Sequence, residues 1–198
     1  KANGKFAIMK LFTHNERSVI TFGSKNYHWV CYTEDLKKTL ALNVHTEITI
    51  SIGQDILKNL ELFYHLIPQF SRGYSLVGEL EDGMHFVPGD NTISWFGLFK
   101  QGFSAPVVST LEKLSDTGLQ TVKHEMVFKP GDQQEKLDRM FSLLKCEQGE
   151  GSVLYISNIE TGVTQLAKSK STLYIFKRMF REIWTKTPTQ LHEKLIKR

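Results

Sequence analysis

The sequence lacks the features that mark several classes of protein. No apolar run approaches the ~20 residues needed to cross a bilayer, and no basic segment followed by an apolar one marks a secretion signal. The two cysteines, Cys31 and Cys146, lie far apart and match no metal-ligand spacing, so we interpret them as buried free thiols. These absences favour an intracellular protein, of the nucleus or cytoplasm, with no membrane partner.

Several catalytic motifs are absent as well. The seven histidines form no zinc-type cluster with cysteines and no H-x-x-x-H pair with a carboxylate. Paired His-x-Thr motifs, typical of cyclic phosphodiesterases, do not occur, and neither does a G-x-x-x-x-G-K-[ST] phosphate loop. The sequence therefore gives no indication of a zinc hydrolase, a cyclic phosphodiesterase or a P-loop kinase.

The length is compatible with one packed domain, and the charge is compatible with a polyanionic binding partner. The chain has 198 residues, a net charge of +4 and a pI near 9.0. Its C-terminal stretch is basic, although Glu182 and Glu193 interrupt it. The basic residues of this stretch can form a surface that binds RNA phosphates or the solvated side of a helix, and both interpretations stay open. They are Lys177, Arg178, Arg181, Lys186, Lys194, Lys197 and Arg198.

Hydrophobic periodicity predicts an α+β protein. The chain opens with a predicted hairpin, strands 5–12 and 18–22, followed by a helix over 34–42 and a longer one over 56–67 that Pro68 closes. The remaining predicted elements are strands 74–80 and 93–99, helix 106–115, strand 121–128, a helix around 137–144, paired strands 152–157 and 162–166, and a long helix from 173 to 183. Strands and helices do not strictly alternate, which favours α+β over a doubly wound sheet.

Five short stretches carry the candidate chemistry. Each is weak alone: a Lys-x-x-Gly sequence is usually a turn, a strand-end glutamate is usually a surface carboxylate, and alternating lysines usually form a solvated strand face. Their order along the chain is the informative feature. The stretches are Lys1-Ala-Asn-Gly4, Gly23-Ser24-Lys25-Asn26, Val77-Gly78-Glu79-Leu80, Glu150-Gly151-Ser152-Val153 and Lys168-Ser169-Lys170-Ser171.

In this order the stretches resemble the covalent nucleotidyltransferase superfamily of ligases and capping enzymes, over essentially the whole chain. Lys1-x-x-Gly4 resembles motif I, Gly78-Glu79 motif III, Glu150-Gly151-x-Val153 motif IV, and Lys168-x-Lys170 motif V. The Ser24-Lys25 turn is similar to that of fungal and plant tRNA ligases and the phage RNA ligase 1 group. So is the Lys-Ser-Lys-Ser sequence that precedes Tyr174, Arg178 and Arg181. Asn3 departs from the Lys-x-Asp-Gly form of many DNA ligases and capping enzymes.

The resemblance implies a fold and an activity. The fold is the nucleotidyltransferase, ATP-grasp-like ligase fold, in which helices flank antiparallel sheets and the nucleotide lies between them. We expect this domain over residues 1–185, without its upstream strand, and a basic helix or tail over 186–198. The activity is ATP-dependent sealing of 5′-phosphate and 3′-hydroxyl RNA ends through a lysyl-AMP intermediate, with magnesium or manganese.

The resemblance also assigns roles to residues. Lys1 attacks the α-phosphorus and needs a free amine, although an ordinary lysine has a pKa near ~10.4. Cations at Lys168 and Lys170 lower that pKa and hold the α-phosphate. Glu150 suits the metal, whose ligands are hard oxygens. The expected nucleotide contacts are Gly4, Glu79 at the ribose, Lys25 at the phosphates or ribose, Arg17 as a weaker candidate, and Phe96, or else Trp95, beneath the base.

Three alternatives stay open. An mRNA-capping guanylyltransferase or a DNA ligase uses the same lysine chemistry, and a non-catalytic nucleotide- or RNA-binding module can keep the fold without turnover. For the ligase, the expected partner is RNA, as tRNA halves or other nicked ends. The domains or enzymes that heal those ends are expected elsewhere, in the parent protein or in other proteins.

Overall fold

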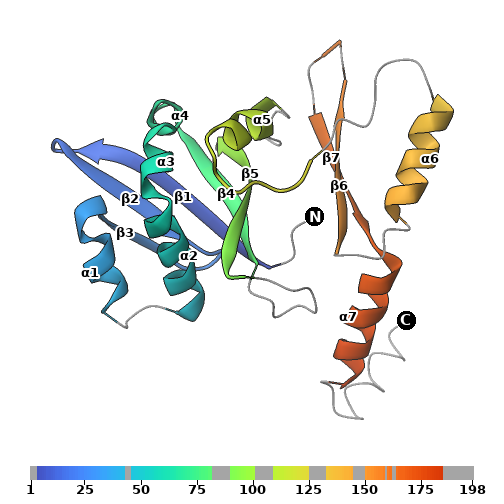
Figure 1. Ribbon diagram of the computed structural model, residues 1–198, viewed down its shortest axis with the longest axis horizontal. Helices are drawn as coiled ribbons and strands as arrows, with labels where there is room; N and C mark the ends of the chain where they lie inside the picture. Colours follow the sequence, from blue (N-terminus) through green and yellow to red (C-terminus); the bar gives the residue numbers. More distant parts are fainter. Residues whose placement is uncertain are drawn as a thin grey trace. The chain divides into compact units, whose positions relative to one another are not determined.

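A computed structural model of the chain describes residues 4–42, 46–81, 90–100, 109–124, 133–144, 150–158, 160–161 and 164–184 (Figure 1). These residues fall into two compact units. The larger unit holds the described residues from 4 to 124, with those between 155 and 166, and the smaller holds 133–144, 150–154 and 167–184. In this described part of the chain no helix is both long and apolar enough to cross a membrane.

The larger unit is built on a five-stranded antiparallel sheet in the order β3-β2-β1-β4-β5. The strands are β1 (Lys5–His14), β2 (Arg17–Gly23), β3 (His28–Tyr32), β4 (Tyr74–Glu81) and β5 (Thr92–Lys100). The first hairpin turns at Asn15 and Glu16, which both adopt positive φ angles, as a two-residue turn between twisted strands requires. The predicted hairpin is confirmed.

Helices cover one face of this sheet (Figure 1). They are the short helix η1 (Thr33–Asp35), α1 (Leu36–Leu40), α2 (Glu47–Lys58), α3 (Leu60–Tyr64) and α4 (Ile67–Ser71). The core lies between the two layers: alternate residues of β1, such as Ala7, Met9 and Leu11, are buried against helical residues such as Ile56 and Phe63. The helix α5 (Ser109–Asp116) contributes Leu114 to the same core.

Two helical details differ from the sequence prediction. The predicted helix 56–67 is three helices, and α2 begins earlier, where the side chain of Thr46 accepts a hydrogen bond from the Thr49 amide. Pro68 lies in the first turn of α4, so it begins a helix instead of closing one, because a first-turn proline removes only an N–H that is unpaired anyway.

Two strand assignments also differ. β3 was not predicted, since its sequence His-Trp-Val-Cys-Tyr has no alternation of apolar and polar residues. Of the predicted strand 121–128, residues 121–124 contain a single parallel bridge, between Thr121 and Trp95. The rest of that prediction lies outside the described residues.

The C-terminal part of the chain has the order that periodicity predicts. α6 (Gln133–Leu144) is followed by β6 (Gly151–Ser157) and β7 (Thr164–Lys170), which form a two-stranded sheet, and by α7 (Thr172–Trp184). β7 extends beyond the predicted end at Leu166, so Lys168 and Lys170 lie on a strand. The mixed α+β class is confirmed, and the predicted helix or tail over 186–198 lies outside the described residues.

Candidate functional site

The first pair of candidate residues meets at the start of β1. The backbone N–H of Gly4 donates a hydrogen bond to Oε1 of Glu79 on β4, with a length of 2.9 Å. β1 and β4 are neighbours with Lys5 opposite Leu80, which places these residues, 75 positions apart, side by side. A Cβ on Gly4 would lie 1.8 Å from the Leu80 carbonyl oxygen, so only glycine permits this approach. Lys1 itself lies outside the described residues.

A polar network lies beside Glu79, on the sheet face opposite the helices. Ser94 lies across from Glu79 on β5, and its hydroxyl donates to Oε1 of Glu81 at 2.5 Å. The side-chain amide of Gln120 donates to Thr92 Oγ1 at 3.1 Å and to Ser94 Oγ at 3.4 Å. Sequence reasoning did not identify Glu81, Ser94 or Gln120. The spacing of Glu81 two residues after Glu79, which puts both on one strand face, was the only available signal.

The two aromatic candidates on β5 have different environments. Trp95 is 1% exposed and packs edge-on against Phe63 in the core, with ring centroids 5.7 Å apart. Phe96 is half-buried, and its ring contacts Phe99 edge-on at 6.1 Å. A β-bulge between Val77 and Gly78 leaves Phe96 without a residue opposite it on β4. Of the two predicted base platforms, only Phe96 therefore has a ring outside the core.

The two basic candidates at the two ends of β2 lie at opposite ends of the sheet. Gly23 pairs with Ile8, so the exposed Lys25 lies in the turn at the end of the sheet that holds Gly4. Arg17 pairs with His14, which lies ten residues after Gly4 and so about 30 Å from it along the strand, at ~3.3 Å per residue. The structure therefore does not bring Arg17 together with Gly4.

Arg17 has acidic and aromatic partners of its own. Its Nε donates to Oε1 of Glu34 at 2.8 Å, and its guanidinium lies 3.4 Å from the centroid of the Tyr32 ring. The hydrogen bond to Glu34 raises the pKa of Arg17, and the same contact lowers the pKa of Glu34. These contacts account for Arg17 without a nucleotide.

The smaller unit brings the remaining candidates together. Glu150 is 5% exposed, and its carboxylate lies 3.7 Å from Nζ of Lys170. Its carbonyl accepts a hydrogen bond from the Ser171 amide at 3.0 Å. Gly151 has a φ of +135°, and a Cβ there would lie 2.0 Å from the carbonyl oxygen of Ser169, so the two strands approach too closely for any other residue. The predicted motif IV and motif V segments are therefore neighbours.

The two lysines of this segment differ in exposure. Lys168 is exposed, whereas Lys170 is half-buried with its Nζ 5.4 Å from the centroid of the Tyr174 ring. Ser171 begins α7, since its hydroxyl accepts a hydrogen bond from the Tyr174 amide at 3.2 Å. The end of β7 and the start of α7 thus hold Lys170 beside both a carboxylate and an aromatic ring.

A magnesium ion is compatible with Glu150. Magnesium is often held by one or two carboxylates together with substrate phosphates and water, and Glu150 supplies one buried carboxylate. Among the described residues, no cluster of three or more His, Cys, Asp or Glu residues could hold a metal alone. Glu150 would hold such an ion together with phosphate oxygens and water.

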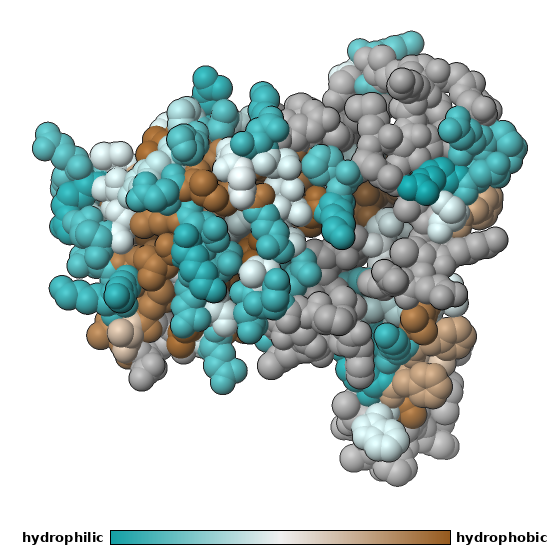
Figure 2. Space-filling model, in the orientation of Figure 1, coloured by the Kyte–Doolittle hydropathy of each residue, from teal (hydrophilic) through white to brown (hydrophobic). Residues whose placement is uncertain are grey.

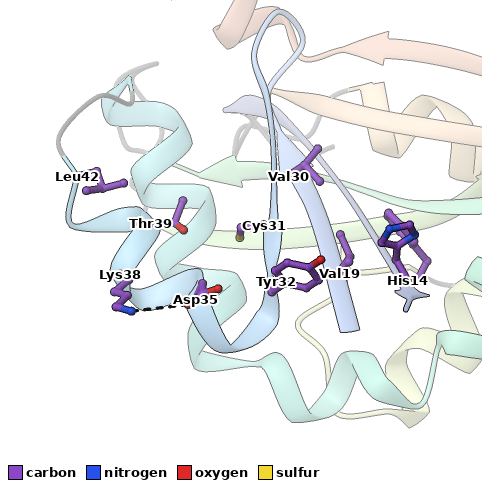
Figure 3. A pocket seen from close by; sticks show the side chains of 10 residues that line it. His14, Val19, Val30, Cys31, Tyr32, Asp35, Lys38, Thr39 and Leu42 are labelled. Atoms are coloured by element: carbon purple, nitrogen blue, oxygen red, sulfur yellow. Dashed lines mark ion pairs between the residues drawn. The ribbon is translucent and has the colours of Figure 1, made fainter. Parts of the chain in front are cut away.

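A cavity of about 820 Å³ lies elsewhere, around β3 and α1 (Figure 3). Thr39 and Leu42 line it from the helical side, and Val19 and Val30 line it from the strands (Figure 3). Cys31 also lines it, and burial raises the pKa of this thiol. None of the predicted site residues lines this cavity, which surrounds the far edge strand of the sheet.

Comparison of the chain with protein-family models, curated proteins and solved structures finds no match. The residues of this chain and their geometry alone therefore carry the functional proposal.

Proposed function

We propose that the chain is the adenylyltransferase domain of an ATP-dependent RNA ligase, of the nucleotidyltransferase fold, with Lys1 as the nucleophile. The observation that carries the proposal is the hydrogen bond between the Gly4 amide and the Glu79 carboxylate. The motif I and motif III stretches were named from sequence alone, and a nucleotide held by both requires them to be adjacent. They are adjacent through a contact that fixes the carboxylate of one against the backbone of the other.

The pairing of Glu150 with Lys170 supports the same proposal. The motif IV and motif V stretches lie side by side, and Gly151 is the residue that permits their close approach. In the proposed site Lys170 and Lys168 hold the α-phosphate, and their positive charges favour the free amine of Lys1. A magnesium ion at Glu150, when bound, supplies positive charge to the triphosphate.

The proposed reaction has three steps. The Nζ of Lys1 attacks the α-phosphorus of ATP, so that a P–N bond forms, the P–O bond to the β-phosphate breaks, and pyrophosphate leaves. The 5′-phosphate of an RNA then attacks the same phosphorus and receives AMP as the lysine amine leaves. A 3′-hydroxyl finally attacks the activated RNA phosphate, and AMP leaves. Phe96 supplies a ring on which the adenine can stack.

Covalent labelling tests this proposal. The protein is incubated with magnesium and ATP labelled at the α-phosphate, and it is then denatured and resolved on a gel. We expect label on the wild-type chain and none on a Lys1→Ala variant. Lys113→Ala serves as the matched control, because Lys113 is exposed on α5 and belongs to no candidate site; it should be labelled like the wild type.

The same gel separates the alternatives. Label from GTP in place of ATP would favour a capping guanylyltransferase. Label from ATP, followed by joining of nicked DNA in preference to nicked RNA, would favour a DNA ligase. A chain that takes no label from either nucleotide, yet binds ATP or RNA reversibly, would contradict the ligase proposal and favour a binding module.

A further inference from the structure

The helix α7 exposes an unusual number of large apolar side chains. Leu173, Ile175, Phe176, Met179, Phe180, Ile183 and Trp184 are each between 43% and 92% exposed, and Figure 2 shows hydrophobic side chains over this helix. The two most exposed of them are aromatic: Phe180 at 66% and Trp184 at 92%. The opposite side of the helix is anchored by Tyr174, which is 8% exposed beside Lys170.

The three aromatic side chains of this surface form a column. Phe176, Phe180 and Trp184 follow one another at four-residue steps. Each step advances about 6 Å along the helix axis and turns by about 40°, so the rings follow one face of the helix. This spacing is almost twice the ~3.4 Å rise of a stacked strand, which suits an extended strand that places one unstacked base on each ring.

A basic column lies beside the aromatic column. Lys177 and Arg181 are also four residues apart, and they lie on the side toward which the aromatic column turns. The third cation, Arg178, lies on the other side and pairs with Glu182 at 3.2 Å. The most exposed rings are therefore next to cations, whereas the aliphatic side chains Ile175 and Met179 lie farther from them.

We propose that this face of α7 binds single-stranded RNA, with bases stacked on Phe176, Phe180 and Trp184 and phosphates near Lys177 and Arg181. Every base has a π-face, so such stacking requires no particular sequence, and a basic groove that follows the backbone adds affinity for any strand. The inference rests on the proposed function in its choice of RNA: this face holds the substrate strand near the end to be sealed.

Conservative variants separate stacking from simple hydrophobic contact. Replacement of the column by Phe176→Leu, Phe180→Leu and Trp184→Leu keeps the apolar face and removes the rings. Phe141→Leu is the matched control, because Phe141 is 57% exposed on α6 with Asp138, not a cation, one turn away. Binding of the full chain to a fluorescent oligouridylate is measured by anisotropy, and the folding of each variant is checked by circular dichroism.

We expect the triple variant to bind oligouridylate about a hundredfold more weakly, since each lost stack weakens binding about fivefold or more, and Phe141→Leu to bind like the wild type. The double variant Lys177→Gln with Arg181→Gln should lower the slope of log affinity against log salt by about 1.4, at ~0.7 per phosphate of a single strand. In the wild type, oligouridylate should quench the fluorescence of the exposed Trp184.

Several results would overturn the inference. Unchanged affinity of the triple variant would do so, as would equal competition by double-stranded RNA. Binding of α7 to anionic vesicles or to a second copy of the chain, with Trp184 fluorescence indifferent to oligouridylate, would assign the face to a different partner.

Failure of this inference and failure of the ligase proposal look different. Self-adenylation needs no RNA, so the triple variant should be labelled by ATP like the wild type. Normal labelling with unchanged RNA affinity would reject the α7 site alone. Loss of RNA binding in the triple variant, together with no labelling of the wild type, would reject the ligase and keep the RNA site.

Discussion

At the scale of single residues, two glycines decide which segments can meet. Gly4 and Gly151 each lie where a Cβ would fall 2.0 Å or less from a carbonyl oxygen of a neighbouring segment. Both were singled out from sequence, as the glycines of Lys-x-x-Gly and Glu-Gly. The atoms that they approach, in Leu80 and Ser169, could not be named in advance, because they depend on the register of strands that pair across the chain.

Gly4→Ala should abolish self-adenylation. The added methyl group would displace the start of β1 from Leu80 and break the hydrogen bond between the Gly4 amide and Glu79. Gly118→Ala is the control: its φ of +82° disfavours alanine by about 1 kcal/mol, but nothing lies within 4 Å of the new Cβ. The control should lose stability in urea and keep its label. Equal labelling of Gly4→Ala and the wild type would contradict the site.

Asp55 gives a stability prediction at the same scale. It is 4% exposed on α2, and its carboxylate accepts a hydrogen bond from the Ile93 amide at 3.3 Å. Asp55→Ala leaves that buried amide unpaired and should cost about 1–3 kcal/mol in urea unfolding. Asp55→Asn keeps an acceptor oxygen and should cost less. Equal losses in the two variants would show that the hydrogen bond is not what stabilises the contact.

The pH dependence of the same pair follows from the pKa. Burial raises the pKa of Asp55, while the Ile93 amide and Lys58 act in the opposite direction. A carboxyl whose folded pKa lies above its unfolded value contributes stability that is fully present below the unfolded pKa and is lost as pH rises through the folded pKa. The wild type should therefore gain stability relative to Asp55→Asn as pH falls from 7 toward 4. If the wild type instead lost stability relative to Asp55→Asn as pH fell, the folded protein would favour the charged form of the buried carboxylate.

At the scale of elements, β5 shows which structural features the hydrophobic pattern of the sequence can predict and which it cannot. The strand was predicted over residues 93–99, and successive side chains of a strand point to opposite faces, which agrees with the burial of Trp95 beside the half-buried Phe96. The bulge opposite Val77 and Gly78 could not be predicted, since it depends on the register between two strands. That bulge leaves Phe96 without a partner on β4.

Matched leucine variants separate the two aromatic residues. Trp95→Leu should lower the free energy of unfolding by about 3 kcal/mol, because it leaves a cavity beside Phe63. Phe96→Leu should change stability little and raise the KM for ATP in self-adenylation about fivefold or more, through loss of a stacked base. Both are measured by urea unfolding and by labelling at varied ATP. A Phe96→Leu variant with unchanged KM would remove Phe96 from the proposed site.

The unpredicted elements have physical causes of the same kind. β3 is an edge strand with two partly exposed faces, so its residues show neither a helical nor a two-residue period. The helical segment from 47 to 71 is interrupted at Asn59, whose backbone angles depart from helical values, and again between the end of α3 at Tyr64 and the start of α4 at Ile67. A local sequence signal such as Pro68 shows that a helix end is near, but it does not show whether a helix begins or ends there.

At the scale of the whole molecule, the candidate residues fall in two groups. Gly4, Lys25, Glu79 and Phe96 belong to the larger unit, and Glu150, Lys168 and Lys170 to the smaller. The resemblance to nucleotidyltransferases named these residues and did not predict how they divide between the units. Within each unit the strand pairing brings residues far apart in the chain into contact, which only tertiary structure can do. The strand pairing places Arg17 at the end of β1 far from Gly4, apart from the other candidates of the larger unit.

The most direct test of the central claim is a single-turnover chase. The chain is labelled with ATP at the α-phosphate, freed of nucleotide, and mixed with magnesium and a nicked RNA duplex that carries a 5′-phosphate and a 3′-hydroxyl. We predict that label leaves Lys1, passes through an adenylated RNA 5′ end and appears as free AMP while the nick is sealed. Label that stays on the protein, or that leaves it without sealing the RNA, would contradict an RNA ligase.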